Sequence, residues 1–378
     1  MKRQLRILQI ASAMPRWAGT ENHVLDLTCE LRRLGHHAVI GCQTDSELQS
    51  RASQLAVPTL LLAMHGTHDW RQLPKFLRAM RNHVDVVHIH HNRDYVVPAT
   101  AARLAGVPAV IMTRHLPHRF SNPLKAFACG KIFYDAIIAV SDAIRRTLID
   151  CGIDAKRIRL VRNGIDFSKA ARADGKTFRA SLNLPEGAFL AVAAGRIEHV
   201  KGFHILIKAV DIARKRGVPV SGVIAGEGAE QNELQKLCDE LGLQQSVKLL
   251  GFRSDVLDIV AAADAAVVPS IWADPFPYAV LEAMACSKPV VASRVGGIPE
   301  MVSERSAALV APGNPEELAE ALINLAQDPN RCVQMGQEAF REVQSFTIPA
   351  MATNVEAVYW EMMSRATQPR ESFAHAGD

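Results

Sequence analysis

Residues 265–282 have the sequence AAVVPSIWADPFPYAVLE, which contains a complete strand–loop–helix unit. The apolar run from Ala265 to Pro269 predicts a strand that is buried on both faces, since it lacks apolar–polar alternation. A loop with one carboxylate, Asp274, follows, and an otherwise apolar helix then carries a second carboxylate, Glu282. A buried strand that leads into a helix is typical of a parallel sheet covered by helices.

The same order of elements is repeated on both sides of this stretch. A helix over about Glu21 to Leu34 has apolar residues on one face, and Asn314-Pro315 has the residue types of an N-cap followed by the first helical position. We therefore predict the α/β class, with two doubly wound, Rossmann-like parallel sheets. Further strands are expected at residues 5–10, 38–41, 84–89, 109–113, 136–140, 189–194, 220–225, 247–250 and 289–293.

Domain boundaries follow from turn-forming residues. The turn Asn163-Gly164-Ile165-Asp166 and the polar residues after it suggest a link between two domains. We expect one domain over residues 1–166, a second over 167–348, a closing helix over 349–366 and a disordered tail over 367–378.

Bulk composition favours a cytoplasmic globular protein. A chain of 378 residues with 48% hydrophobic residues can form two domains, and its apolar runs are too short to span a membrane. The N-terminus has no apolar segment of the kind found in signal peptides. The seven cysteines are scattered and form no Cys-x-x-Cys pair, which argues for a reducing compartment and against a disulfide framework or a zinc site.

Charge is distributed unevenly between the two halves. Residues 1–168 hold 23 basic and 13 acidic side chains, a net charge of +10, whereas the remainder holds 20 basic and 26 acidic ones, a net charge of −6. The basic half predicts an anionic partner, either a membrane surface or an acidic acceptor, although solvated helix faces explain the charge equally well. Aromatic residues, 6% of the chain, do not alternate with the basic ones, so nucleic acid is not expected. The basic residues that could face such an anionic partner include Lys75, Arg78, Arg81, Arg114, Arg119, Lys125 and Lys131.

Glu282 is the first candidate for ligand binding. Ala279 and Cys286 share its helix face, so the carboxylate has no cation on its own helix. An apolar environment raises the cost of the ionised form unless hydrogen-bond donors are present, and ligand hydroxyl groups are suitable donors. A solvated Glu at a helix edge, or one paired with a distant Arg, is the alternative.

Arg196 and Lys201 form a second candidate site, in the loop after the strand at residues 189–194. Two cations at the start of a helix repel one another unless an anion joins them, and a diphosphate would do so. The alternative is a pair of surface cations, partly neutralised by Glu198.

Three other strand-to-helix loops contain glycine. Gly19, the sequence Gly226-Glu227-Gly228 and the pair Gly296-Gly297 would each allow close approach of the backbone to an anion. Each of them is explained equally well by a tight turn.

Histidines follow two strands of the first half. His88 and His90 share a strand face, so a metal pair is conceivable, but no carboxylate or cysteine is suitably spaced to complete it. We therefore expect hydrogen-bonded core histidines and no metal site. His115 follows the next strand and could donate to a substrate hydroxyl group.

These motifs, taken in order, resemble the GT-B glycosyltransferases of family 4, which are retaining enzymes that use nucleotide-sugar donors. The resemblance extends over nearly the whole chain and implies two domains that face a central cleft, with the last helix crossing back to the first domain. The motifs are Ala18-Gly19-Thr20-Glu21, Ala139-Val140-Ser141, Asn163-Gly164-Ile165-Asp166, Gly195-Arg196 with Lys201-Gly202, Asp274 to Glu282, and Gly296 to Glu300.

The resemblance implies a role for each matching residue. The second domain would bind the donor, with Arg196 and Lys201 on the diphosphate and Glu282 on the ribose. Asp274 would hold hydroxyl groups of the transferred sugar, together with backbone amides around Phe276 and Pro277. In the first domain, which would bind the acceptor, His115 would lie near the reacting sugar and Gly19 near the phosphates. Glu227 would also bind the donor.

The implied reaction is sugar transfer with retention at the anomeric carbon. The leaving diphosphate would help to deprotonate the acceptor, and no metal or other cofactor would be needed beside the co-substrate, a UDP-sugar or GDP-sugar. The acceptor is expected to be a surface glycan or a lipid-linked sugar. The enzyme would then be cytoplasmic and could associate with the inner face of the membrane.

Two departures from the family pattern leave other functions open. The first acid of the pair is Asp274 where the family has Glu, and Ala18 replaces a glycine. Either change could alter donor choice or weaken activity. A sugar-nucleotide epimerase and a non-catalytic nucleotide-sugar sensor are the alternative functions.

Overall fold

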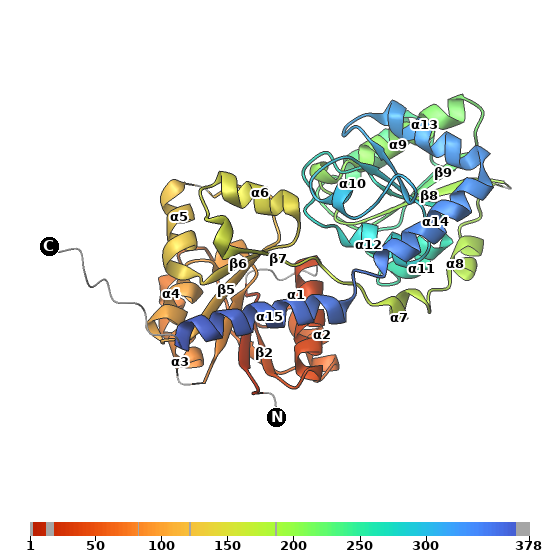
Figure 1. The fold of residues 1–378 in the computed structure, drawn as a ribbon. Coiled ribbons are helices and arrows are strands. Elements are labelled where there is room, and N and C mark those ends of the chain that lie inside the picture. Colours follow the sequence, from red (N-terminus) through yellow and green to blue (C-terminus); the bar gives the residue numbers. More distant parts are fainter. Residues whose placement is uncertain (1–2, 13–18, 82, 121, 186, 368–378) are drawn as a thin grey trace. The chain divides into compact units, whose positions relative to one another are not determined.

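The computed structural model describes residues 3–12, 19–81, 83–120, 122–185 and 187–367 (Figure 1). The chain divides into two compact units, the first comprising residues 1–162 and 348–378 and the second residues 163–347. The predicted tail, apart from Thr367, lies outside the described residues. No helix in the described ranges is both long enough and apolar enough to cross a bilayer.

The first unit contains a seven-stranded parallel sheet of order β3-β2-β1-β4-β5-β6-β7. Its strands are β1 (Arg6–Ile10), β2 (His37–Cys42), β3 (Thr59–Leu61), β4 (Val86–Ile89), β5 (Ala109–Arg114), β6 (Ala136–Ala139) and β7 (Ile158–Leu160). The helices are α1 (Gly19–Arg33), α2 (Glu47–Gln54), α3 (Leu73–Met80), α4 (Val97–Leu104), α5 (Pro123–Phe127), α6 (Asp142–Asp150) and α15 (Ile348–Thr367). Shorter helical segments are η1 (Trp70–Gln72), η2 (Asn92–Asp94), η3 (Ala128–Phe133) and η4 (Ala155–Arg157).

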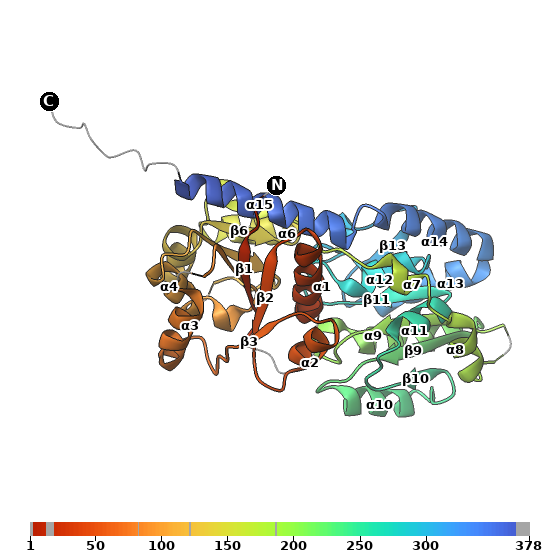
Figure 2. The same ribbon diagram turned by 90° about the horizontal axis from the view of Figure 1, so that it is seen from below.

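Helix α15 packs on the sheet of the first unit, beside α1 (Figure 2). Its apolar residues, including Met351, Val355 and Met362, form one buried cluster with residues of the sheet. The bond from Arg159 Nε to Glu361 Oε2, 2.8 Å long, joins the helix to the strand β7. Burial of so many apolar side chains explains why the last segment of the chain belongs to the first unit.

The second unit contains a six-stranded parallel sheet of order β10-β9-β8-β11-β12-β13. Its strands are β8 (Phe189–Ala194), β9 (Val220–Ala225), β10 (Val247–Leu249), β11 (Ala265–Val268), β12 (Val290–Ser293) and β13 (Ala307–Val310). The helices are α7 (Phe167–Ala170), α8 (Gly175–Ser181), α9 (Phe203–Lys215), α10 (Gln231–Glu240), α11 (Val256–Ala262), α12 (Tyr278–Ala285), α13 (Pro315–Gln327) and α14 (Pro329–Val343), with the short segments η5 (His199–Lys201) and η6 (Ile298–Glu300).

The predicted cap of α13 is confirmed. Asn314 is extended, and its side chain accepts a hydrogen bond from the backbone N–H of Glu317, with 3.1 Å between the two atoms. Pro315 occupies the first helical position, where its missing N–H has no cost. The cap fixes the start of a helix whose apolar face packs into the core of the second unit.

Candidate active site

The order of strands in the second unit locates the candidate site. The chain runs from β8 to β9 on one side of the sheet and later enters β11 on the other side of β8. Ligands of doubly wound sheets bind beyond the carboxyl ends of the strands where the order reverses in this way. Arg196 and Lys201 follow β8, Glu227 follows β9, and Asp274 follows β11, so the predicted residues lie in loops at this edge.

Lys201 and Asp274 are in direct contact. Lys201 Nζ lies 2.6 Å from Asp274 Oδ2, and the two side chains are 27% and 11% exposed. Ser270 Oγ also donates to Asp274 Oδ2, over 3.1 Å. The structure therefore brings together two residues that are 73 positions apart in sequence and that were both predicted as site residues.

The loops after β8 and β11 touch through backbone atoms. Gly202 adopts a left-handed conformation, with φ of +68°, and a Cβ atom there would lie 2.0 Å from the carbonyl oxygen of Pro269. The backbone N–H of Ile271 donates to the carbonyl of Val200, over 3.0 Å. Glycine is required at position 202 because no side chain fits between the two loops, and this contact fixes the position of Lys201.

The loop that follows β12 supports Asp274 in a similar way. The backbone N–H of Gly297 donates to the carbonyl of Asp274, over 2.8 Å. At Gly296, where φ is +57°, a Cβ atom would lie 2.1 Å from that same oxygen. The predicted glycine pair therefore holds the backbone of Asp274.

The loop after β9 packs against the loop after β8. A Cβ atom on Gly226 would lie 1.8 Å from the carbonyl oxygen of Gly195, and the backbone N–H of Ile197 donates to the carbonyl of Glu227 over 2.9 Å. The side chain of Glu227 is exposed, and only its backbone takes part in this contact.

Arg196 pairs with a neighbouring carboxylate in this structure. Its Nη1 atom lies 2.7 Å from Glu198 Oε1, and the two side chains are 50% and 39% exposed. This is the alternative that the sequence left open. An exposed ion pair contributes little to stability, at most about 1 kcal/mol, so exchange of Glu198 for a phosphate group would cost little.

Glu282 lies on α12 and is partly exposed. Burial raises its pKa from 4.5 to about 7. No residue of the described ranges donates a hydrogen bond to its carboxylate or forms an ion pair with it. The sequence predicted only that its own helix offers no cation, and had left a distant Arg open. A ligand that supplies hydroxyl donors would favour the ionised form.

Replacing Glu282 by Gln is expected to stabilise the protein at alkaline pH. The folded state keeps the Glu282 proton up to about pH 7, whereas the unfolded chain releases it near 4.5. Because the folded state binds more protons in this range, the free energy of unfolding falls as pH rises through it. Gln cannot ionise, so the free energy of unfolding of the variant should exceed that of the native protein by on the order of 2 kcal/mol at about pH 8. At about pH 4 the two should be equal.

Urea denaturation at the two pH values measures this difference. Glu240→Gln is the control, since Glu240 is 59% exposed. An equal change in stability at both pH values for Glu282→Gln would contradict the raised pKa.

The prediction that backbone amides around Phe276 and Pro277 hold the transferred sugar concerns the residues just before α12. The ring of Phe276 is buried against Phe346, with 5.3 Å between ring centroids, and its carbonyl accepts from Asn163 Nδ2 over 3.1 Å. Pro277 has no N–H and cannot donate. Helix α12 begins at the next residue, Tyr278, and the backbone N–H of Val280 donates to the carbonyl of Pro277 over 3.2 Å.

The two predicted residues of the first unit lie at the ends of different elements. Gly19 is the first residue of α1 and is exposed, whereas Ala18 lies outside the described residues. His115 follows β5 and is partly exposed.

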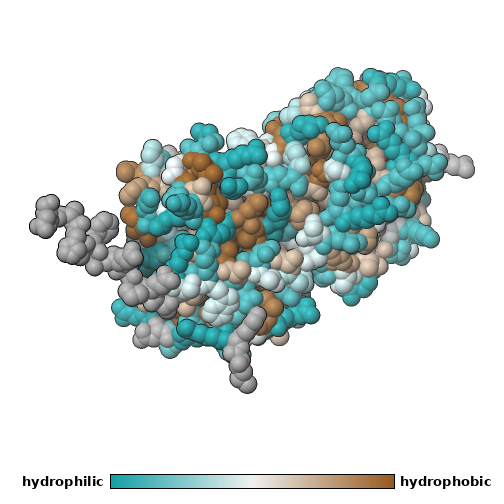
Figure 3. Space-filling model, in the orientation of Figure 1, coloured by the Kyte–Doolittle hydropathy of each residue, from teal (hydrophilic) through white to brown (hydrophobic). Residues whose placement is uncertain are grey.

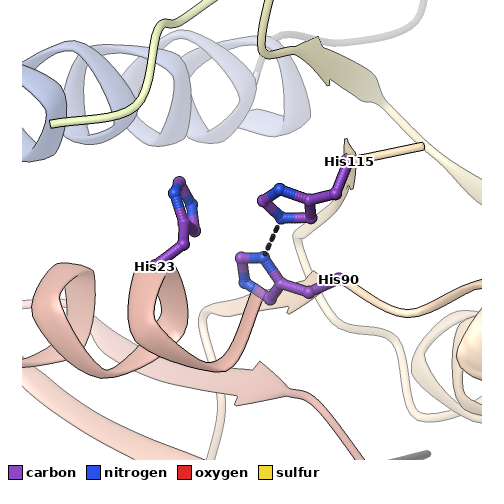
Figure 4. Close-up of side chains that lie close together, drawn as sticks. All are labelled: His23, His90 and His115. Carbon is purple, nitrogen blue, oxygen red and sulfur yellow. Dashed lines mark hydrogen bonds between the residues drawn. The ribbon is translucent and has the colours of Figure 1, made fainter. Parts of the chain in front are cut away.

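His115 belongs to a cluster with His90 and His23 (Figure 4). His115 Nε2 lies 3.2 Å from His90 Nδ1, and His90 Nε2 lies 2.7 Å from Gln9 Oε1. Burial, together with the neighbouring histidines, lowers the pKa of His90 and of His115 well below the ordinary value. Both rings are therefore neutral at pH 7.

His88 forms hydrogen bonds within the core, as expected. Its Nδ1 atom lies 2.7 Å from the hydroxyl group of Tyr359, and its Nε2 atom lies 2.6 Å from Thr113 Oγ1. Tyr359 is on α15, so this contact joins two segments that are distant in sequence. Sequence analysis missed the partners Gln9, Tyr359 and His23, because no local spacing links them to the two histidines.

One of the predicted surface cations is buried. Arg114 is 4% exposed, and its Nη1 atom donates to Asn92 Oδ1 over 2.7 Å. Its guanidinium group also lies over the rings of Tyr95 and Phe120. Arg114 is therefore a structural residue and does not contribute to a basic surface. Lys75, Arg78, Arg81, Arg119 and Lys131 are exposed, and Lys125 is partly exposed.

Comparison with known proteins identifies a family for each part of the chain. Residues 17–169 match the model described as Glycosyltransferase Family 4, and residues 174–342 match Glycosyl transferases group 1. The crystal structure of Anabaena HepE in complex with UDP and glucose has a TM-score of 0.85 and 24% identity, and the match covers 95% of this chain and 100% of that one. This likeness supports the GT-B fold.

Two relatives have names that state an activity. The D-inositol 3-phosphate glycosyltransferase of Kineococcus radiotolerans is 31% identical, over 78% of this chain and 74% of that protein. The UDP-Gal:alpha-D-GlcNAc-diphosphoundecaprenol alpha-1,3-galactosyltransferase of Escherichia coli is 26% identical, over 81% of this chain and 83% of that protein. Several other matches cover only about half of the relative's length. Together with the two family models, these relatives confirm the resemblance stated from the sequence, and the chain belongs to the family 4 glycosyltransferases of GT-B fold.

Proposed function

We propose that the protein transfers a sugar, with retention, from a UDP-sugar or GDP-sugar to a surface-glycan or lipid-linked acceptor, and that transfer needs no metal or other cofactor. The observation that carries this proposal is the ion pair between Lys201 and Asp274 beyond the carboxyl ends of β8 and β11. The pair sets a cation, which we propose binds phosphate, beside a carboxylate, which we propose binds sugar hydroxyl groups.

Donor binding would replace the present partners of Lys201 and Arg196. A donor diphosphate would take Lys201 Nζ as its counter-ion, and Arg196 would exchange Glu198 for the same diphosphate. Asp274 would then be free to accept hydrogen bonds from the transferred sugar while it keeps the bond from Ser270. Glu282 would ionise as the ribose hydroxyl groups donate to it. Glu227, the backbone amides around Phe276 and Pro277, and Gly19 remain further proposed donor contacts.

The chemical step exchanges one bond at the anomeric carbon for another on the same face. The bond to the diphosphate oxygen breaks, the bond to the acceptor oxygen forms, and the acceptor proton passes to an oxygen of the leaving diphosphate. Lys201 and Arg196 would stabilise the charge that develops on that leaving group. His115 is proposed as a hydrogen-bond partner of the reacting sugar.

Nucleotide-sugar binding is the first test of this function. A bound donor raises the melting temperature by mass action, so a thermal-shift screen of UDP-sugars and GDP-sugars should select one of them. Incubation of that donor with lipid-linked acceptors in the presence of EDTA should yield a product whose anomeric configuration, measured by NMR, equals that of the donor. An isomerised sugar formed from donor alone, or binding without turnover on any acceptor, would contradict the proposal.

A lipid-linked acceptor requires access to a membrane surface, and the segment α5–η3 has suitable residues. Leu124, Phe127 and Ile132 are 80%, 59% and 54% exposed, and Lys125 and Lys131 belong to the same segment. Figure 3 shows hydrophobic residues among hydrophilic ones in the region of α5. Exposed apolar side chains next to basic ones bind anionic bilayers. We propose that the protein works in the cytoplasm, at the inner face of the membrane.

The double variant Leu124→Ser/Phe127→Ser is expected to bind anionic liposomes with an affinity at least about tenfold lower than that of the native protein. The reason is that it removes two apolar side chains from the contact. Co-sedimentation with liposomes measures this. The control is Leu55→Ser/Leu104→Ser, since these leucines of the first unit are 57% and 64% exposed. Equal losses for the two double variants would exclude α5–η3 as the membrane contact.

A further inference from the structure

Three histidines from separate segments of the first unit meet at one point. His23 comes from α1, His90 follows β4, and His115 follows β5 (Figure 4). One nitrogen atom from each ring can be chosen so that all three atoms lie within 4.8 Å of one another. His23 and His90 are buried, and His115 is partly exposed. The separation of these residues in sequence hid the cluster from any argument based on local spacing.

The spacing of the two nearer nitrogens fits a metal-binding site. His90 Nδ1 and His115 Nε2 are 3.2 Å apart. In a tetrahedral zinc site with Zn–N bonds of about 2.0–2.1 Å, neighbouring nitrogens lie about 3.3 Å apart. The ring centroid of His23 is 4.7 Å from that of His115 and 5.5 Å from that of His90, and its ligand nitrogen lies within 4.8 Å of the other two, so His23 would move closer when an ion binds.

A second layer of hydrogen bonds orients the central ligand. Gln9 Nε2 donates to the hydroxyl group of Tyr359 over 3.0 Å, which directs Gln9 Oε1 toward His90 Nε2. His90 therefore donates from Nε2 and keeps a lone pair on Nδ1, the atom that faces His115. Histidine ligands of metals are usually fixed in this way, by a partner on the other ring nitrogen. Without an ion, His115 Nε2–H would donate to the same lone pair.

We propose that His23, His90 and His115 bind a divalent transition-metal ion of the zinc type, with one coordination position left for water or another small ligand. Three imidazoles suit zinc, cobalt, nickel or copper, whereas magnesium and calcium prefer oxygen ligands. This site is separate from the transfer step, which we propose to be metal-independent.

The ion is expected to inhibit sugar transfer. This consequence rests on the proposed function, which assigns His115 to the reacting sugar; the metal site itself does not. An ion bound to His115 Nε2 would remove that nitrogen from the sugar.

Titration of the metal-free protein, residues 1–378, with Co²⁺ tests the site directly. Tetrahedral coordination by nitrogen gives Co²⁺ a visible absorption band, and Zn²⁺ should displace the ion and abolish the band. His23→Ala should weaken Co²⁺ binding about a hundredfold or more, since even loss of a second-layer partner costs up to that factor. His115→Ala, at a partly exposed position, is the second variant in case His23→Ala does not fold.

The control is His199→Ala/His204→Ala. These two residues and Glu230 form another group with nitrogen and oxygen atoms within 4.8 Å of one another, on the second unit. The double variant should bind Co²⁺ with unchanged affinity at the proposed site. Loss of the absorption band in this control, or equal Co²⁺ affinity in the native protein and in both His23→Ala and His115→Ala, would overturn the metal site. A Co²⁺ ion that binds there without slowing transfer would overturn the inhibition alone.

Discussion

Gly202→Ala is expected to destabilise the second unit by more than about 4 kcal/mol, enough to unfold many proteins. The new Cβ atom would lie 2.0 Å from the carbonyl oxygen of Pro269 and 3.0 Å from its carbon. Both atoms belong to the backbone, so no side chain can rotate to make room. The loops after β8 and β11 would have to separate, and the ion pair between Lys201 and Asp274 would break with them.

A matched substitution distinguishes the destabilisation caused by this steric clash from that caused by a non-glycine residue in the left-handed conformation. Gly217 has φ of +81°, but nothing lies within 4 Å of an added Cβ atom. Gly217→Ala should therefore cost only about 1–2 kcal/mol, the ordinary penalty for that conformation. Thermal and urea unfolding of both variants, followed by circular dichroism, measure the difference. Equal destabilisation would mean that the loops can separate without loss.

The strand pattern predicted the fold wherever strands are buried on both faces. Every strand expected from the sequence is present, and all of them except the edge strand β10 are apolar runs that helices bury on the two sides of a parallel sheet. The strands β3, β7 and β13 were not predicted. Each has three or four residues and lies at the edge of a sheet, where burial is partial and the apolar signal is correspondingly weak.

The sequence predicted which loops should carry the donor site, but not which side chains of those loops are in contact. The rule that ligands bind at the carboxyl ends of strands selected the loop with Lys201, the carboxylate pattern and the family resemblance selected Asp274, and the structure pairs the two residues. The sequence left open whether Arg196 binds a phosphate or pairs with Glu198, and the structure shows the ion pair with Glu198. Arg114 was expected on the surface because of its charge, since the sequence does not show that the rings of Tyr95 and Phe120 cover it.

Lys201→Ala is expected to lower kcat/KM about 10²–10³-fold, the usual effect of removing one group that stabilises charge in a transition state. Donor affinity should fall as well, because the ammonium group is proposed to bind the diphosphate in the ground state. Lys208→Ala is the control, since Lys208 is an exposed residue of the neighbouring helix α9. Steady-state kinetics with the selected donor and calorimetric titration of the nucleoside diphosphate measure the two effects.

A double-mutant cycle decides whether Lys201 acts on the donor or only on Asp274. If the lysine only neutralises the carboxylate, then Lys201→Ala should not reduce the affinity for the nucleoside diphosphate any further in an Asp274→Asn background. In that background no carboxylate charge remains to be compensated. If Lys201 binds the diphosphate, its removal should still reduce the affinity for the nucleoside diphosphate, a ligand that lacks the sugar which Asp274 is proposed to hold. We expect the second result. An unchanged affinity in the Asp274→Asn background would limit Lys201 to a structural role, and Arg196 would then be left as the cation proposed for the phosphates.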